Sequence, residues 1–161
     1  MKLSIVYDSK TGSTAKMAEY IAEGIRTVPG AQVQIFPITA VDEAYVKASS
    51  ALIVGTPTYN GSLTARMKSW LEEAPAKLDV AGKLGGAFAT SNVPQGGPVM
   101  AIESILTQLL VKGMLVYSGG TSLGKPNIHL GPVCTGPEMT GMDLFPVFGQ
   151  RFASKAAELF K

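Results

Sequence analysis

The chain has 161 residues, of which 46% are hydrophobic and 16% are charged, and its formal net charge is +2. This length accommodates one domain with a sizeable core, and the composition excludes a disordered chain. The small net charge, with lysine and arginine scattered along the chain, argues against a nucleic-acid partner, and no apolar stretch reaches the roughly 20 residues of a membrane span.

Short apolar runs alternate with helical patterns along the chain. The apolar runs predict five strands, over 3–7, 33–36, 51–55, 84–90 and 114–118. A helix follows each strand: the first has an apolar stripe from Ala18 to Ile25 and ends at Pro29-Gly30, and the second is short, from Asp42 to Ala48. The other three helices have apolar stripes from Leu63 to Leu71, from Ile102 to Leu109 and from Phe148 to Phe160. Asp143 is a candidate N-cap of the last helix, and Pro146 falls in its first turn.

This alternation predicts the α/β class, with a single domain over 1–161 built as a three-layer α/β/α sandwich on a parallel sheet. The runs at 3–7, 51–55 and 114–118 are almost continuously hydrophobic, as is typical of strands covered on both faces. Residues 119–142 hold six glycines and three prolines without clear periodicity. A loop of that length in a compact domain is usually functional or locally structured.

A turn rich in hydroxyl groups follows the first predicted strand. Ser9, Thr11, Ser13 and Thr14 surround Gly12, and a helical pattern begins directly after them. The first N–H groups of a helix lack partners and attract anions, and a glycine lets the backbone approach a ligand closely. The alternative is that Ser13 or Thr14 simply caps the helix. Four hydroxyl groups in six positions favour a phosphate-binding turn.

Three common phosphate sites do not fit this turn. A P-loop needs a Gly-Lys-Ser/Thr step, which is missing, and a dinucleotide fold needs three spaced glycines and an acidic residue after the second strand. A phospho-receiver domain needs several carboxylates at the strand tips, whereas Asp8 is alone there.

Two stretches resemble a known family. "SKTGSTAKMAEYI" resembles the Ser/Thr-x-Thr-Gly-x-Thr phosphate loop of flavodoxins, and "GTPTYNGSLTARMKSWLEE" resembles the loop and helix after the third strand of flavodoxin-like proteins. The second stretch is nearest to the NAD(P)H:quinone oxidoreductases related to the tryptophan-repressor-binding protein. The resemblance covers residues 2–118 fairly continuously, and the two motifs together are specific.

The resemblance implies a flavodoxin-like fold with a five-stranded parallel sheet in the order 2-1-3-4-5, and bound FMN beyond the carboxyl ends of the strands. By position it implies phosphate contacts from Ser9, Lys10, Thr11, Gly12, Ser13 and Thr14, isoalloxazine contacts from Pro57, Thr58, Tyr59, Asn60 and Gly61, and pyrimidine-edge contacts from Thr90, Ser91, Asn92, Gln95, Gly96 and Gly97. No catalytic side chain is expected, because the flavin itself performs the redox chemistry.

The electron-transfer role has two main interpretations. An FMN-dependent NAD(P)H oxidoreductase of a small acceptor such as a quinone is preferred, because the chain is slightly basic and its third loop has no aromatic residue to cover one flavin face. A carrier flavodoxin that shuttles electrons between redox partner proteins is the alternative. It is favoured by the compact connection after the fourth strand and by Lys112, which stands where the reductases often have a histidine. A non-redox domain for another phosphorylated ligand is a remote third interpretation.

Four further expectations complete the interpretation. The N-terminus enters a strand without a signal-peptide pattern, which predicts a cytoplasmic protein, and a homo-oligomer is left open. Cys134, the one cysteine, cannot form an internal disulfide and is expected to be an inert thiol. His129, in the glycine-rich segment, is expected to be solvated rather than to contact the flavin or a substrate.

Overall fold

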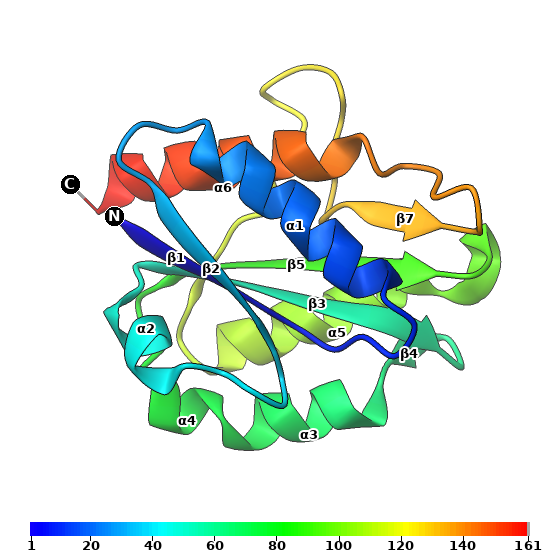
Figure 1. Cartoon of the computed structure of the whole chain (residues 1–161), viewed down its shortest axis with the longest axis horizontal. Coiled ribbons are helices and arrows are strands. Elements are labelled where there is room, and N and C mark those ends of the chain that lie inside the picture. The colour runs from blue at the N-terminus through cyan, green and yellow to red at the C-terminus, as the bar shows by residue number, and fades with distance from the viewer. Residues whose placement is uncertain (161) are drawn as a thin grey trace.

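Five parallel strands form the centre of the molecule. The computed structural model describes residues 1–160. Its strands β2 (Gln32–Pro37), β1 (Lys2–Tyr7), β3 (Ala51–Tyr59), β5 (Leu84–Ser91) and β6 (Leu115–Val116) lie side by side in that order, and Figure 1 labels the first four. All four neighbouring pairs are parallel. The α/β class and the strand order 2-1-3-4-5 are therefore confirmed, because β5 and β6 are the fourth and fifth strands of the prediction.

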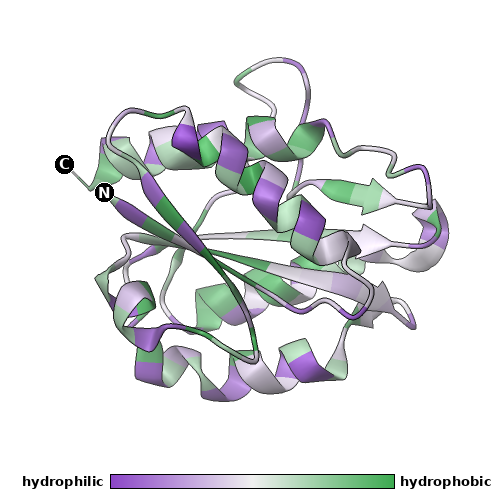
Figure 2. Ribbon diagram, in the orientation of Figure 1, coloured by the Kyte–Doolittle hydropathy of each residue, from purple (hydrophilic) through white to green (hydrophobic). Residues whose placement is uncertain are grey.

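Helices cover both faces of this sheet. α1 (Ser13–Arg26) and α6 (Leu144–Leu159) pack on one face, and α2 (Glu43–Ala48), α3 (Ala65–Glu73), α4 (Pro75–Leu78) and α5 (Pro98–Val111) pack on the other (Figure 1). Hydrophilic and hydrophobic segments alternate along α1 and α3, as expected of helices with one buried face (Figure 2). Within residues 1–160, no helix is both long and apolar enough to cross a bilayer.

The close contact of α1 with α6 depends on glycine. A Cβ atom at Gly24 would lie 1.9 Å from the carbonyl oxygen of Pro146, and one at Gly149 would lie 2.1 Å from that of Ile21. Asp143 is the N-cap residue of α6, as predicted, but its side chain makes no capping hydrogen bond. The tight contact fixes α1, and the turn that precedes it, against the sheet.

Two short additional strands make the sheet seven-stranded, which corrects the predicted count of five. β4 (Ser62–Leu63) forms an antiparallel hairpin with β3, and β7 (Val133–Thr135) runs parallel to the end of β5. The hairpin turns at Asn60 and Gly61, whose φ values of 52° and 77° suit a tight two-residue connection. Leu63 therefore lies in a strand rather than in the helix that its spacing predicted.

The predicted strand over 114–118 is too long. Only the two residues of β6 pair with the start of β5, and the strand ends at Val116. Gly119 and Gly120 follow in the connection, with φ values of 86° and 61°. The chain returns as β7 opposite Ala89–Ser91. Between the two strands it arches over α6, where the Arg151 guanidinium donates to the carbonyl oxygen of Pro126 at 2.9 Å (Figure 1). Part of the glycine-rich segment therefore borders the carboxyl end of the sheet.

Candidate functional site

The residue at the N-cap position of α1 has no side chain that could cap the helix. Gly12 occupies the N-cap position with a φ of 100°, and no side-chain hydrogen bond caps α1 from that position. Ser13 and Thr14 are the first two helical residues, so the alternative that one of them is the N-cap is wrong. A positive φ at this position favours glycine over other residues, which explains the residue type.

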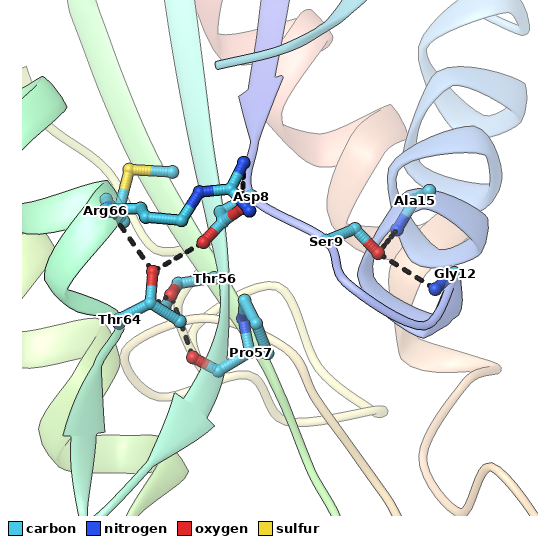
Figure 3. Close-up of polar contacts among 9 residues, drawn as sticks. Asp8, Ser9, Gly12, Ala15, Thr56, Pro57, Thr64 and Arg66 are labelled. Carbon is cyan, nitrogen blue, oxygen red and sulfur yellow. Dashed lines mark hydrogen bonds and ion pairs between the residues drawn. The ribbon is translucent and has the colours of Figure 1, made fainter. Parts of the chain in front are cut away.

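Most backbone N–H groups of this turn have no protein acceptor. The N–H groups of Gly12 and Ala15 donate to Ser9 Oγ at 3.2 and 3.4 Å (Figure 3). Within residues 1–160, no protein atom accepts from the N–H groups of 10, 11, 13 and 14. The first turn of α1 also contains no acidic residue. Unpaired donors at the positive end of a helix make a site for an anion.

A cavity of about 100 Å³ opens over this turn. Side chains and backbone from the carboxyl ends of three neighbouring strands line it: Lys10, Thr11, Ser13 and Thr14 after β1, Pro57, Thr58 and Tyr59 from β3, and Thr90, Ser91 and Asn92 from the end of β5. The helices that follow β1 and β3 lie on opposite faces of the sheet, so the cavity stands where the winding direction reverses. Ligands of open α/β sheets bind at such positions.

Buried hydroxyl groups form the floor of the cavity. The Oγ1 atoms of Thr14 and Thr90 are 2.9 Å apart, and the two residues are only 1% and 5% exposed. Thr58 Oγ1 is buried and has no hydrogen-bond partner within residues 1–160. A buried hydroxyl without a partner costs folding free energy, so the Thr58 hydroxyl remains available to hydrogen-bond a ligand in the cavity.

Seven of the predicted site residues do not line the cavity: Ser9, Gly12, Asn60, Gly61, Gln95, Gly96 and Gly97. Gly97 nevertheless brings two of the loops together, because a Cβ atom there would lie 2.8 Å from Gly61 Cα. His129 is exposed and does not line the cavity, as expected.

Three lining residues were not predicted: Cys134, Gly136 and Met139. They come from β7 and the loop after it, within the segment that was noted for its length and glycine content. Burial raises the pKa of the Cys134 thiol, and the nearby Lys16 ammonium opposes that shift. The protonated, 3% exposed thiol agrees with the expectation of an inert cysteine.

A larger groove of about 780 Å³ lies beside this cavity, between the β3–β4 hairpin, α3 and α5, and Tyr59 lines both. Lys68 and Glu103 are its charged residues, and it contains none of the unpaired amides of the turn before α1. Lys68 already pairs with Glu72 at 2.7 Å. The cavity over the turn before α1 is therefore the candidate site for a phosphorylated ligand, because the unpaired amides lie there and not in the larger groove.

Comparison with known proteins identifies the family of this chain. The flavodoxin family model matches residues 5–92. A protein named flavodoxin from Clostridium saccharobutylicum is 42% identical over 161 residues, which span 99% of this chain and 100% of that protein. A protein named NAD(P)H dehydrogenase (quinone) from Chromohalobacter salexigens is 28% identical over 197 positions, with 98% of each chain covered. That alignment is longer than the 161 residues of this chain, so the second relative carries insertions.

A solved structure of a mutant flavodoxin from Fusobacterium nucleatum, bound to flavin mononucleotide, matches with a TM-score of 0.69 at 20% identity. The match covers 99% of this chain and 97% of that one, and at this identity it supports the fold alone. The family model covers more than half of the chain, and the relative from Clostridium aligns over its full length. The chain therefore belongs to the flavodoxin family.

Proposed function

We propose that this chain binds FMN in the cavity at the carboxyl ends of β1, β3 and β5, and that it transfers electrons through the bound flavin. The observation that carries the proposal is the turn at residues 9–14, where four backbone N–H groups without a protein acceptor belong to residues that line a cavity rich in hydroxyl groups. Membership of the flavodoxin family supports FMN as the phosphorylated ligand.

The residues that line the cavity suit the different parts of FMN. The amides of the turn, with the Lys10 ammonium and the Thr14 hydroxyl, would bind the phosphate dianion. Thr90 would donate to Thr14 Oγ1 while Thr14 donates to the phosphate, so both buried hydroxyls would be paired. The unpaired hydroxyl of Thr58 would bond the polar edge of the ring system, and Tyr59 would cover one ring face.

FMN, when bound, supplies the electron-transfer chemistry, and the protein binds it, orients it and excludes water from it. Tyr59 is 44% exposed, so the edge of the site lies open at the surface. An exposed edge allows an electron donor or acceptor to come close to the ring without a conformational change. No side chain is required to exchange protons with a substrate in this arrangement.

We place the role of electron carrier first. The relative from Clostridium aligns with this chain end to end and is named flavodoxin, whereas the quinone dehydrogenase aligns only with insertions that this chain lacks. A carrier needs a protein reductase to load it with electrons and a protein acceptor to unload it. This favours a redox partner protein over a small-molecule acceptor.

An NAD(P)H-dependent quinone reductase is the second candidate, and one structural observation favours it. Residues 92–97, which follow β5, include no aromatic residue, and Tyr59 is the one aromatic residue among those that line the cavity. The face opposite Tyr59 would then be open to a nicotinamide or a quinone.

Spectroscopy tests whether the protein binds FMN, and a turnover assay tests whether it is a carrier or a reductase. The purified protein, saturated with FMN and freed of excess, should have the visible absorption bands of an oxidised flavin. With NADH or NADPH alone and without oxygen, the carrier should keep these bands until a flavodoxin reductase is added. Bleaching by the nicotinamide without that reductase, followed by rapid reduction of added benzoquinone, would establish the reductase instead. A colourless protein after FMN addition would refute the proposed function.

A further inference from the structure

A buried carboxylate lies directly beneath the two loops that would hold FMN. The side chain of Asp8 is 4% exposed, and its residue is the last one before the turn at 9–14. Its backbone N–H donates to the carbonyl oxygen of Gly55 at 3.0 Å, which continues the β1–β3 pairing by one residue. The carboxylate does not line the cavity, so its role has to be derived from its contacts.

The contacts of Asp8 join the two loops (Figure 3). Thr64 Oγ1 donates to Asp8 Oδ2 at 2.6 Å, and Thr64 Oγ1 also accepts from the N–H of Met67 as the N-cap of α3. The Thr64 N–H donates in turn to Thr56 Oγ1 at 3.2 Å. The loop from Thr56 to Thr64, which contains Thr58 and Tyr59, is therefore closed on itself and tied to Asp8.

One exposed cation balances this buried charge. Arg66 Nη2 lies 3.3 Å from Asp8 Oδ1, and the Arg66 side chain is 57% exposed. Asp8 Oδ1 makes no hydrogen bond, so the guanidinium acts on it through charge and not through a directed bond. Arg66 is therefore the neutralising partner of a carboxylate that would otherwise be buried and uncompensated.

We propose that Asp8 is a positioning residue for the flavin site: it ties the phosphate turn to the flavin-flanking loop, and its charge, balanced by Arg66, sets the potential of the flavin. The inference rests on the proposed function. A negative charge near the site opposes addition of an electron to the flavin, and a positive charge favours it. Removing one partner of the pair should thus shift the midpoint potential in the opposite direction from removing the other.

Midpoint potentials of the FMN-loaded protein test the charge. Asp8→Asn keeps an oxygen that accepts from Thr64 but removes the carboxylate charge, so the potential should rise. Arg66→Gln removes the balancing cation, so the potential should fall. Each change should alter the ratio of reduced to oxidised FMN affinity at least threefold, or about 28 mV at 59 mV per tenfold for one electron. The double variant should return close to the unmodified protein, and Arg66→Lys is the control that keeps the charge.

The tie between the loops has a separate readout in the protein without cofactor. Asp8→Ala removes the acceptor of the Thr64 hydroxyl and leaves Thr64 as the N-cap of α3, whereas Asp8→Asn keeps an acceptor. Backbone amides of the 59–62 hairpin should exchange hydrogen faster in Asp8→Ala and at the original rate in Asp8→Asn. Equal exchange in the two variants would overturn the mechanical part of the inference.

The outcomes separate this inference from the proposed function. If the unmodified protein takes up no FMN, the proposed function fails and the inference fails with it. If FMN binds but the two single variants leave the potential unchanged, or shift it in the same direction, only the inference fails. Should Asp8→Asn not fold, the exposed Arg66 variant decides the electrostatic part alone, because an unchanged potential in Arg66→Gln would refute it.

Discussion

The pair of buried hydroxyls at the base of the cavity allows stability and cofactor binding to be measured separately. Thr14→Val removes one hydroxyl and leaves Thr90 Oγ1, previously 2.9 Å from its partner, buried without a hydrogen bond. An unsatisfied buried hydroxyl costs about 1–3 kcal/mol of folding free energy, whereas replacing both partners with apolar groups of the same shape is nearly neutral. The double variant Thr14→Val with Thr90→Val should therefore recover most of the stability that Thr14→Val loses.

Binding of FMN should behave differently. A hydrogen bond from Thr14 to the phosphate dianion is worth about 1.5–3 kcal/mol, because the acceptor is charged. At about 1.4 kcal/mol per tenfold, Thr14→Val should weaken FMN binding by about 12- to 140-fold. The second substitution cannot restore a donor to the phosphate, so the double variant should bind FMN as weakly as Thr14→Val.

Two titrations decide this prediction. Urea unfolding of the FMN-free protein gives the stability of each variant, and quenching of FMN fluorescence gives the dissociation constant. Thr90→Val alone is the matched control, since it removes the partner hydroxyl and keeps Thr14. Recovery of FMN affinity together with stability in the double variant would show that Thr14 acts only through folding, and the assignment of a phosphate contact would be wrong.

Three further predictions follow from single contacts. Gly24→Ala should destabilise the fold by about 1–3 kcal/mol or more, since its Cβ would lie 1.9 Å from the Pro146 carbonyl oxygen, without changing the FMN dissociation constant; unfolding and FMN titration measure both. Cys134 should react slowly with iodoacetamide in the free protein and more slowly with FMN bound, because the thiol is buried in the cavity lining and burial raises its pKa. Tyr59→Ala should shift the flavin midpoint potential in potentiometry while changing stability little, because the side chain is 44% exposed.

Each of these predictions has a contradicting outcome. Loss of FMN affinity in Gly24→Ala at unchanged stability would place the α1–α6 contact in the binding site. Equal alkylation of Cys134 with and without FMN would separate the thiol from the ligand. A change in unfolding midpoint alone would make Tyr59 structural.

The raised pKa of Cys134 also predicts how the free energy of unfolding changes with pH. The folded chain holds the thiol proton more tightly than the unfolded chain, so this contribution to stability is complete below the ordinary pKa of 9.0 and is lost as the pH rises through the raised value. Cys134→Val should flatten the decline in stability above that pH, as measured by urea unfolding. An identical decline in both proteins would contradict the shift.

Local patterns were sufficient to predict the central sheet. Continuous apolar runs identified the parallel strands, and their alternation with helical stripes, together with the family resemblance, predicted the strand order that the structure confirms. The split between β6 and β7 was not predictable in the same way, because an apolar run does not show where a chain leaves a sheet. β6 ends at Val116, and a separate strand, Val133–Thr135, pairs with the end of β5 instead.

In the candidate site too, residues adjacent in sequence could be predicted, and residues that only the fold brings together could not. The turn at 9–14 was predicted because its hydroxyls and its glycine are adjacent in sequence. The Thr14–Thr90 pair joins residues 76 positions apart, and the Asp8–Thr64 bond joins residues 56 positions apart, so no local pattern contains either. Cys134 and Met139 were missed for the same reason, because only the return of the chain as β7 places them in the lining.

The affinity for FMN compared with that for riboflavin tests the central claim most directly, because the two ligands differ only in the phosphate. Calorimetric titration of the FMN-free protein with each ligand gives both dissociation constants. Loss of only two charge-assisted hydrogen bonds costs about 3 kcal/mol or more, so FMN should bind at least about 100-fold more tightly than riboflavin. Equal affinity for the two ligands would contradict the assignment of the turn before α1 as the phosphate site.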